Sequence, residues 1–247
     1  RVLQVGNSAY FSQGLRCYTV DEAVNRVGYD QVYELVSSAV ASEVLVRPLV
    51  TYSIAPDELW QSSVACAVAA ESLAERIGIE RAIAYTVGLL HRVGLVAIDE
   101  WLQRAAPAVR FTKGALPFET MEQERQRLGF HNAEAGAALL RLWDFPAVMS
   151  EPVRWQYLPS ATAAHGQLAA LLAVAKWISV TALTQQRPAR GLETALLRRC
   201  GLSESQLATE IVHVRSRLDA ISSLLAENHE GQLLSFPGGD RLIVGVC

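Results

Sequence analysis

Apolar residues recur every three or four positions through most of this chain, and alternating runs of apolar and polar residues are scarce before the C-terminal tail. The first spacing places apolar side chains along one face of a helix, so it predicts an all-α fold. In the tail, residues 233–236 and 242–244 flank Pro237-Gly238-Gly239-Asp240. This pattern predicts a short C-terminal β-hairpin, which needs a surface to dock on because a lone hairpin is only marginally stable.

Capping residues mark the ends of two helices. Thr19 with Glu22, and Ser203 with Gln206, have the three-residue spacing of a capping box. In such a box the two residues satisfy free backbone N–H groups at the start of a helix. Gly28 ends the helix that Thr19 begins, because glycine readily adopts the conformation that terminates helices. A second helix is expected over residues 29–46.

Beyond these residues the pattern predicts a long helix followed by a buried one. Asp57 or Glu58 opens the long helix, and Gly78 ends it. Residues 82–90 carry no charge, which predicts a helix that is buried on every side and that ends at His91.

The remaining helices are expected at residues 94–103, at 133–143 with Asn132 as N-cap, and at a closing apolar stripe over 207–225. Residues 106–117 contain proline and glycine and are interpreted as a surface loop.

Pro48 and Pro56 bracket a connector that divides the chain. We expect a smaller N-terminal helical subdomain at 1–55, a helical core at 56–228, and the tail at 229–247. Because the chain begins within an apolar run, further residues are expected to precede Arg1.

Composition narrows the function. With 51% hydrophobic and 19% charged residues the chain has enough apolar surface for a core. A net charge of -3 gives no support to nucleic-acid binding. The four cysteines form no C-x-x-C pair, so we expect reduced thiols, a cytoplasmic location and no cofactor. The apolar run 168–183 is interrupted by Lys176 and predicts a buried helix rather than membrane insertion.

A collinear series of short motifs resembles the HDOD domains, the "HD-related output domains" of bacterial signalling proteins. Family elements such as NSAYF, LW-x-H-S, GLLHDIG, G-x-D-H-A-E-V-G, W-x-L-P and I-x-x-H-H-x-P have counterparts in order, and the resemblance covers about residues 1–225. The counterparts are residues 6–11 (GNSAYF), 19–28 (TVDEAVNRVG), 59–63 (LWQSS), 88–94 (GLLHRVG), 129–136 (GFHNAEAG), 142–146 (LWDFP) and 153–159 (VRWQYLP).

The resemblance implies a helical bundle like that of the HD phosphohydrolases, which hold divalent metals through histidines and aspartates. In this chain the His–Asp pair reads His91-Arg92. Amides and a cation stand at other expected ligand positions. Neutral amides are poor ligands for transition metals, and cations repel metal ions. These vestigial positions are Gln61, His91, Arg92, Asn132, Gln156, Tyr157 and Lys176. We therefore expect no metal and no catalysis.

Two of these residues keep alternative interpretations. His91 is expected to be a packed histidine bonded to backbone or to a carboxylate, and His131 is one position from the ligand register, so a shifted alignment would restore it. Arg92 either forms an internal salt bridge with Glu134 or Asp99, which we favour, or binds an anion together with Lys176.

The sequence thus favours a non-catalytic bacterial signalling module that binds other proteins. The resemblance implies cyclic-di-GMP, chemotaxis or motility components as partners, and a homodimer is left open. The alternatives are a residual metal-dependent phosphohydrolase using His91 and His131, and a nucleotide or anion sensor using Arg92 and Lys176.

Overall fold

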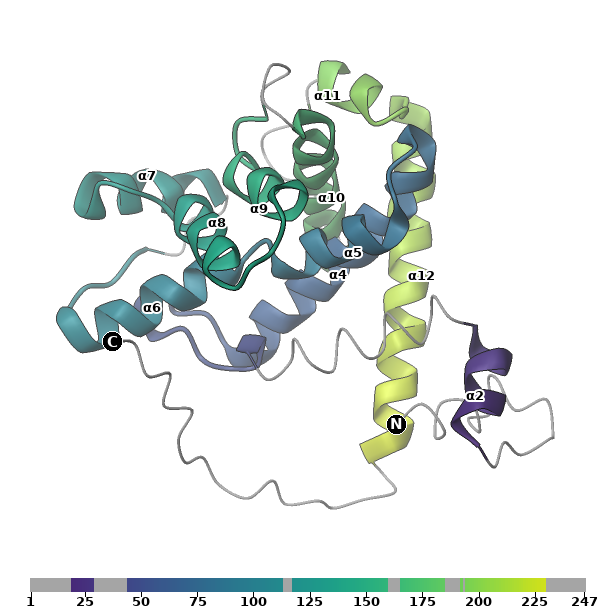
Figure 1. Ribbon diagram of the computed structural model, residues 1–247, viewed down its shortest axis with the longest axis horizontal. Coiled ribbons are helices and arrows are strands. Elements are labelled where there is room, and N and C mark those ends of the chain that lie inside the picture. Colours follow the sequence, from purple (N-terminus) through teal and green to yellow (C-terminus); the bar gives the residue numbers. More distant parts are fainter. Residues whose placement is uncertain are drawn as a thin grey trace.

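The computed structural model describes residues 19–28, 44–112, 117–159, 165–184, 192 and 194–229 (Figure 1). Within these ranges the secondary structure is helical, apart from an isolated antiparallel bridge between Leu49 and Ile54. The all-α class is therefore confirmed. The helices are α2 (Val20–Val27), η1 (Val50–Tyr52), α4 (Pro56–Ala74), η2 (Glu75–Ile77), α5 (Arg81–Leu90), α6 (Val93–Ala105), α7 (Pro117–Leu128), α8 (Asn132–Leu142), α9 (Ala147–Arg154), α10 (Gly166–Thr184), α11 (Thr194–Arg199) and α12 (Glu204–His229).

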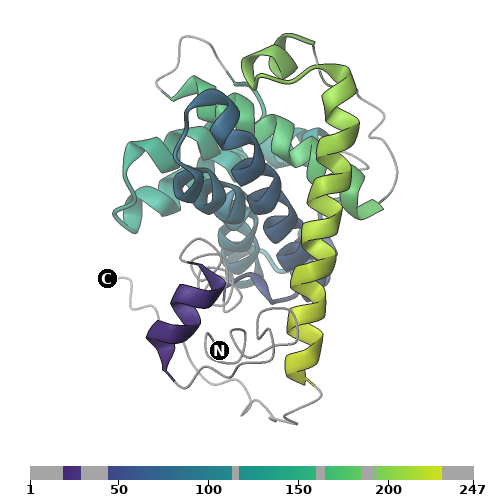
Figure 2. The ribbon, with the colours of Figure 1, turned by 90° about the vertical axis from the view of Figure 1, so that its right-hand side faces the viewer.

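Helix α4 lies at the centre of the bundle, in contact with α5, α10 and α12 (Figures 1 and 2). Residues 64–70 of α4 are almost completely buried, and most are alanine or valine. Small side chains let the neighbouring helices approach closely. At Gly88 of α5 a Cβ atom would lie 2.7 Å from the Cα atom of Ala67, so this crossing requires glycine.

A second close crossing joins α6 to α8. A Cβ atom on Gly94 would lie 1.9 Å from the carbonyl oxygen of Asn132 and 2.6 Å from the backbone nitrogen of Gly136. No side chain fits at Gly94. The crossing brings the start of α8 against the turn between α5 and α6, where His91 and Arg92 lie.

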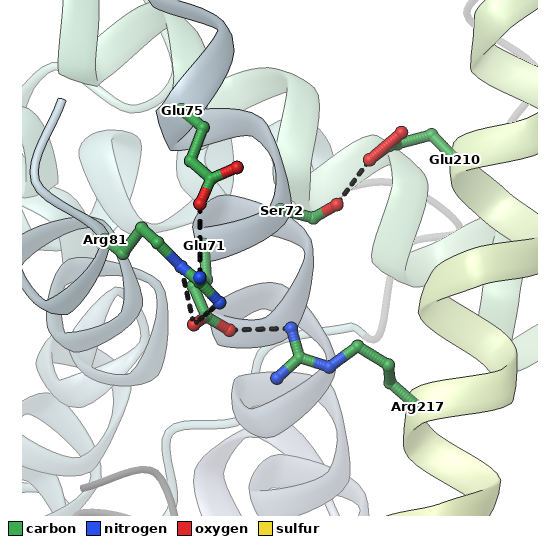
Figure 3. A network of polar contacts seen from close by, with 6 residues as sticks. All are labelled: Glu71, Ser72, Glu75, Arg81, Glu210 and Arg217. Atoms are coloured by element: carbon green, nitrogen blue, oxygen red, sulfur yellow. Dashed lines mark hydrogen bonds and ion pairs between the residues drawn. The ribbon is translucent and has the colours of Figure 1, made fainter. Parts of the chain in front are cut away.

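The closing helix α12 runs along one side of the bundle and is fastened to α4 by charged residues (Figures 2 and 3). The buried carboxylate of Glu71 accepts hydrogen bonds from Arg217 at 2.7 Å and from Arg81 at 2.7 Å. Glu210 accepts from Ser72 and, at 3.1 Å, from Arg76. Both carboxylates are buried and paired, so removing either partner would leave an uncompensated charge.

Both predicted capping boxes mark the helices correctly. The Thr19 hydroxyl accepts a hydrogen bond from the Glu22 backbone at 3.2 Å, and Gly28 ends α2 with φ of 91°. At the start of α12, the Ser203 backbone donates to Gln206 at 2.9 Å and the Ser203 hydroxyl accepts from the Gln206 backbone at 3.4 Å.

The connector between Pro48 and Pro56 is packed into the main core rather than exposed between two units. Leu49, Tyr52 and Ile54 are buried in the same apolar cluster as α4 and α5, and the Phe111 backbone donates to the Thr51 carbonyl at 2.8 Å. Phe111 itself is buried against Tyr52, although it lies in the expected surface loop. The subdomain boundary at residue 55 stays a prediction, although Leu45, Leu49, Tyr52 and Ile54 belong to the core cluster.

Other expectations differ in detail or lie elsewhere. The N-cap of α8 is His131 rather than Asn132, because the Glu134 side chain accepts a hydrogen bond from the His131 backbone at 3.1 Å. Helices α7, α9 and α11 were not predicted. Most of the helix expected at 29–46, and the tail hairpin, lie outside the described residues.

Two helical stretches, 81–105 and 166–184, are long and apolar enough to cross a membrane by composition alone. In each, 67% of the most apolar window is buried inside the domain, as expected for the core helices of a folded bundle.

Candidate functional site

The turn between α5 and α6 carries His91 at the end of a helix that is buried on most sides. The Nδ1 atom of His91 lies 2.6 Å from the carbonyl oxygen of Gly88. Because a carbonyl can only accept, Nδ1 carries the proton and Nε2 is an acceptor. Burial, together with the positive charges of Lys176 and Arg92, lowers the pKa of His91 well below its usual value. His91 is thus a neutral, backbone-bonded histidine, as the sequence predicted.

Arg92 reaches back to the first turns of α4. Its Nη1 atom donates to the Ser62 hydroxyl at 2.5 Å, and that hydroxyl donates to the Leu59 carbonyl at 2.9 Å. Gln61, which was predicted to occupy this site, is exposed to solvent. Its assignment was wrong by one residue, since successive residues on a helix point about 100° apart. Ser62 holds the position.

The predicted salt bridge between Arg92 and Glu134 or Asp99 is not formed. The Asp99 carboxylate accepts a hydrogen bond from the Thr51 backbone at 2.7 Å, and Glu134 caps α8. Neither carboxylate pairs with Arg92, and the nearby carboxylate of Glu58 favours its charged form. Instead, each of these two carboxylates accepts a hydrogen bond from a backbone N–H group.

Lys176 enters the site from the middle of α10. Its Nζ atom donates to Gln156 Oε1 at 2.7 Å and lies 3.8 Å from the ring centroid of Tyr157. Gln156 in turn donates through Nε2 to the carbonyl oxygens of His91 and Val153, both at 2.9 Å. Burial lowers the pKa of Lys176 to about 7, with a further lowering by Arg92. The lysine is partnered, as expected, by an amide and an aromatic face.

A chain of hydrogen bonds extends from Tyr157 to the segment before α4. The Tyr157 hydroxyl donates to Asn132 Oδ1 at 2.9 Å. Glu124 Oε2 accepts from the backbone and side-chain nitrogens of Asn132 at 2.6 and 2.8 Å, and Oε1 accepts from the Tyr52 hydroxyl at 2.7 Å. Burial raises the pKa of Glu124 despite these three bonds. The chain joins η1, α7, α8 and the turn after α9.

Six of the seven predicted positions therefore meet in one polar cluster, which we define as Ser62, His91, Arg92, Asn132, Gln156, Tyr157 and Lys176 with the supporting pair Tyr52 and Glu124. Sequence reasoning missed the last two and Ser62. Counting the family pattern LW-x-H-S along residues 59–63 would have found Ser62, because its histidine register falls there. Glu124 lies in a stretch of many polar residues and gave no signal.

His131 lies at the edge of the polar cluster. Its ring meets the Tyr157 ring edge-on at 5.9 Å, and Nε2 lies 3.7 Å from Glu134 Oε2. Its Nδ1 atom is buried without a hydrogen-bond partner among the described residues. Burial lowers the pKa of His131, partly offset by Glu134.

The polar cluster does not fit a divalent metal ion. Such an ion needs several imidazole or carboxylate donors at once. Among the described residues no group of three or more His, Cys, Asp or Glu side chains could hold a metal. Beside His91 lie Arg92, which is bonded to Ser62, and Lys176, which is bonded to the Gln156 amide.

Comparison with known proteins places this geometry in a family. An uncharacterised protein of Treponema pallidum (strain Nichols) is 28% identical over 227 residues, which is 89% of this chain and 42% of that protein. A Marinobacter aquaeolei VT8 structure, proposed to act in signal transduction, has a TM-score of 0.67 and 21% identity over 94% of this chain and 52% of its own. The chain thus spans about half or less of each of these two relatives.

In two further structures the match extends over a larger share of the matched protein. A Shewanella amazonensis SB2B protein, proposed to be a phosphohydrolase, has a TM-score of 0.63 and 22% identity over 91% of this chain and 81% of its own. An HDOD domain protein of unknown function from Geobacter sulfurreducens has a TM-score of 0.61 and 19% identity over 88% and 80%. At these identities the structures share the fold. The HDOD domain model itself matches residues 1–159, and the chain belongs to the HDOD domain family.

Proposed function

We propose that this protein is a non-catalytic module of bacterial signal transduction that acts in the cytoplasm by binding other signalling proteins. The observation that carries the proposal is the bonding of the polar cluster. Arg92 and Lys176 stand where a metal site would need ligands, and Lys176 is hydrogen-bonded to Gln156 rather than to an anion. A bundle held in this way has no means to activate water by a metal.

The physical reason is electrostatic. A metal lowers the pKa of bound water and polarises a phosphoryl group through its own charge. Arg92 and the protonated form of Lys176, both beside His91, oppose the entry of a further cation. The positive charges of Lys176 and Arg92 lower the pKa of His91, in addition to the larger effect of burial.

The rival function is a residual phosphohydrolase. One observation favours it: His91 keeps Nδ1 protonated against a backbone carbonyl, which is the tautomer that metal-binding histidines use. The Shewanella relative is proposed to be a phosphohydrolase. In that function His91 would be one metal ligand, and His131, whose Nδ1 atom has no hydrogen-bond partner among the described residues, would be the other histidine.

Metal analysis separates the two functions. The protein is purified without chelators, dialysed against manganese, iron and zinc in turn, and assayed for bound metal and for hydrolysis of a chromogenic phosphodiester. We expect substoichiometric metal and no turnover above buffer. A stoichiometric divalent ion with turnover that the His91→Ala variant abolishes would overturn the proposal.

An exposed apolar surface for a protein partner lies at the C-terminal end of α8. Leu142 is 74% exposed and Trp143 is 44% exposed. We propose that these two side chains form part of a contact surface for a protein partner, since exposed apolar patches mark such surfaces. Cross-linking in the native host, followed by mass spectrometry, should recover a partner joined near α8. We expect the double variant Leu142→Ser/Trp143→Ser to lose that cross-link while keeping its helical content.

The control is the double variant Val212→Ser/Leu183→Ser, which changes exposed apolar residues on α12 and α10. If this control loses the same partner and the α8 variant does not, the binding surface lies elsewhere.

A further inference from the structure

The two cations of the polar cluster have no carboxylate partner among the described residues. Arg92 makes one hydrogen bond, to the Ser62 hydroxyl, although a guanidinium carries five N–H donors. Lys176 bonds to a neutral amide and lies over an aromatic ring. Elsewhere in the bundle the half-buried Arg217 is paired with Glu71. The polar cluster therefore holds positive charge that is not neutralised by an ion pair.

The two cations share one electrostatic environment. Arg92 lowers the pKa of Lys176, and both lower the pKa of His91. Glu58 lies near enough to favour the charged form of Arg92. Two like charges held together while desolvated are costly, and an anion between them would offset that cost.

The side chains of the site are partly buried rather than fully enclosed. Ser62, Arg92, Tyr157 and Lys176 come from α4, the α5–α6 turn, the turn after α9 and α10, and each keeps part of its surface exposed. Arg92 is held in place, because Ser62 accepts from it and is itself anchored to the Leu59 carbonyl. A guanidinium fixed at one nitrogen leaves the others free to bind an incoming oxygen pair.

We propose that Arg92 and Lys176 form a metal-independent binding site for the phosphate group of a small molecule. The inference rests on the proposed loss of the metal centre, since a metal would occupy the same positions. A phosphate dianion matches two positive charges, whereas a carboxylate neutralises one. A forked guanidinium also pairs with two phosphate oxygens at once.

The first test is titration calorimetry of the whole chain with sulfate, and with chloride at equal ionic strength as reference. Sulfate is used because it remains a dianion across the working pH range. We expect sulfate to bind and chloride not to. The variant Arg92→Gln should bind about tenfold more weakly or worse, the loss expected for a charge-assisted hydrogen bond. Equal binding of sulfate and chloride, or equal binding by Arg92→Gln, would contradict the site.

Two further variants guard against effects on folding. Arg92→Lys keeps the charge and loses the fork, so it should bind sulfate with intermediate affinity. Arg198→Gln removes an exposed arginine of α11 and should bind as the wild type does. Thermal unfolding without anion establishes that each variant is folded.

The source of the phosphate is identified by comparing inorganic phosphate, a nucleoside monophosphate and a cyclic dinucleotide. Tighter binding of a nucleotide than of phosphate would show that the base is recognised too. Equal binding identifies a site for the phosphate group alone. Failure of all three, with sulfate also unbound, overturns the inference.

The pH dependence provides an independent readout. The groups that face Lys176 are Cys66 from α4, His91 and Arg92 from the α5–α6 turn, and Tyr157. Burial raises the pKa of Cys66 to about 12 and raises that of Tyr157, while His91 stays neutral. Lys176 is then the group that titrates near pH 7. Sulfate affinity should fall as pH rises above 7, and Lys176→Met should abolish that fall.

The outcomes for the two proposals are distinguishable. A protein without metal and without hydrolysis that binds no phosphate keeps the proposed function and loses this site. A protein that holds a stoichiometric metal and hydrolyses phosphodiesters loses both.

Discussion

The hydroxyl of Tyr157 donates a hydrogen bond to the side-chain oxygen of Asn132 at 2.9 Å, and so joins the turn after α9 to the first turn of α8. Asn132 in turn donates a hydrogen bond to Glu124, and the ammonium group of Lys176 lies over the face of the Tyr157 ring. The polar cluster thereby ties together segments that are far apart in sequence.

The α6–α8 crossing gives a prediction about stability. Gly94→Ala places a methyl group against the Asn132 carbonyl and should lower the free energy of unfolding by about 3 kcal/mol or prevent folding, since overpacking against backbone cannot relax. Gly136→Ala is the control, because its Cβ would meet neighbours at 3.2 to 3.4 Å. Urea unfolding should rank Gly94→Ala well below Gly136→Ala, and equal midpoints would contradict the crossing.

Glu124 should make stability fall as pH rises. Burial raises the pKa of its carboxyl in the folded protein above the value of about 4.3 of an unfolded chain. The stability that it adds is complete below the unfolded pKa and is lost as pH rises through the folded pKa. We expect the wild type to lose stability relative to Glu124→Gln over this range, as measured by urea unfolding. If the unfolding free energies of the two proteins changed in parallel with pH, the pKa of Glu124 would be the same in the folded and unfolded states.

Lys176 should act in the opposite direction. Burial lowers its folded pKa to about 7, well below its value of about 10.4 in an unfolded chain. The unfolded state then binds more protons, so stability rises with pH between these two values and is lost as pH falls through 7. The unfolding free energy of the wild type should therefore increase relative to that of Lys176→Met from pH 7 to pH 10. A constant difference would place the ammonium in bulk solvent.

The attachment of α12 should depend on Glu71. Its carboxylate binds Arg217 of α12 and Arg81 of α5, and it is buried (Figure 3). Breaking a buried charge pair costs about 3 to 5 kcal/mol. Glu71→Gln should therefore speed hydrogen exchange across α12, measured by mass spectrometry.

The matched control for α12 is Glu100→Gln, which removes an exposed carboxylate bound by Arg47 at 2.6 Å and by Arg104. Such surface pairs contribute about 0 to 1 kcal/mol. Equal exchange in both variants would show that apolar packing alone holds α12.

Local signals predicted much of the fold. Three kinds of feature depend only on residues close in sequence and could therefore be predicted: the caps at Thr19 and Ser203, the uncharged run of α5 and the apolar stripe of α12. Helix α7 was missed because its sequence is mostly polar. Its role comes from Glu124, which is buried only because α8 and Tyr52 cover it.

The composition of the polar cluster could be read from the sequence, and its connections could not. The motif order alone identified His91, Arg92, Asn132, Gln156, Tyr157 and Lys176 as a set, because a family pattern preserves spacing along the chain. Only the tertiary structure decided that Arg92 lacks the expected carboxylate and that Glu124 supports Asn132. Those facts depend on helix rotation and on which surfaces meet at Gly94, and such long-range contacts leave no periodic trace in the order of the residues.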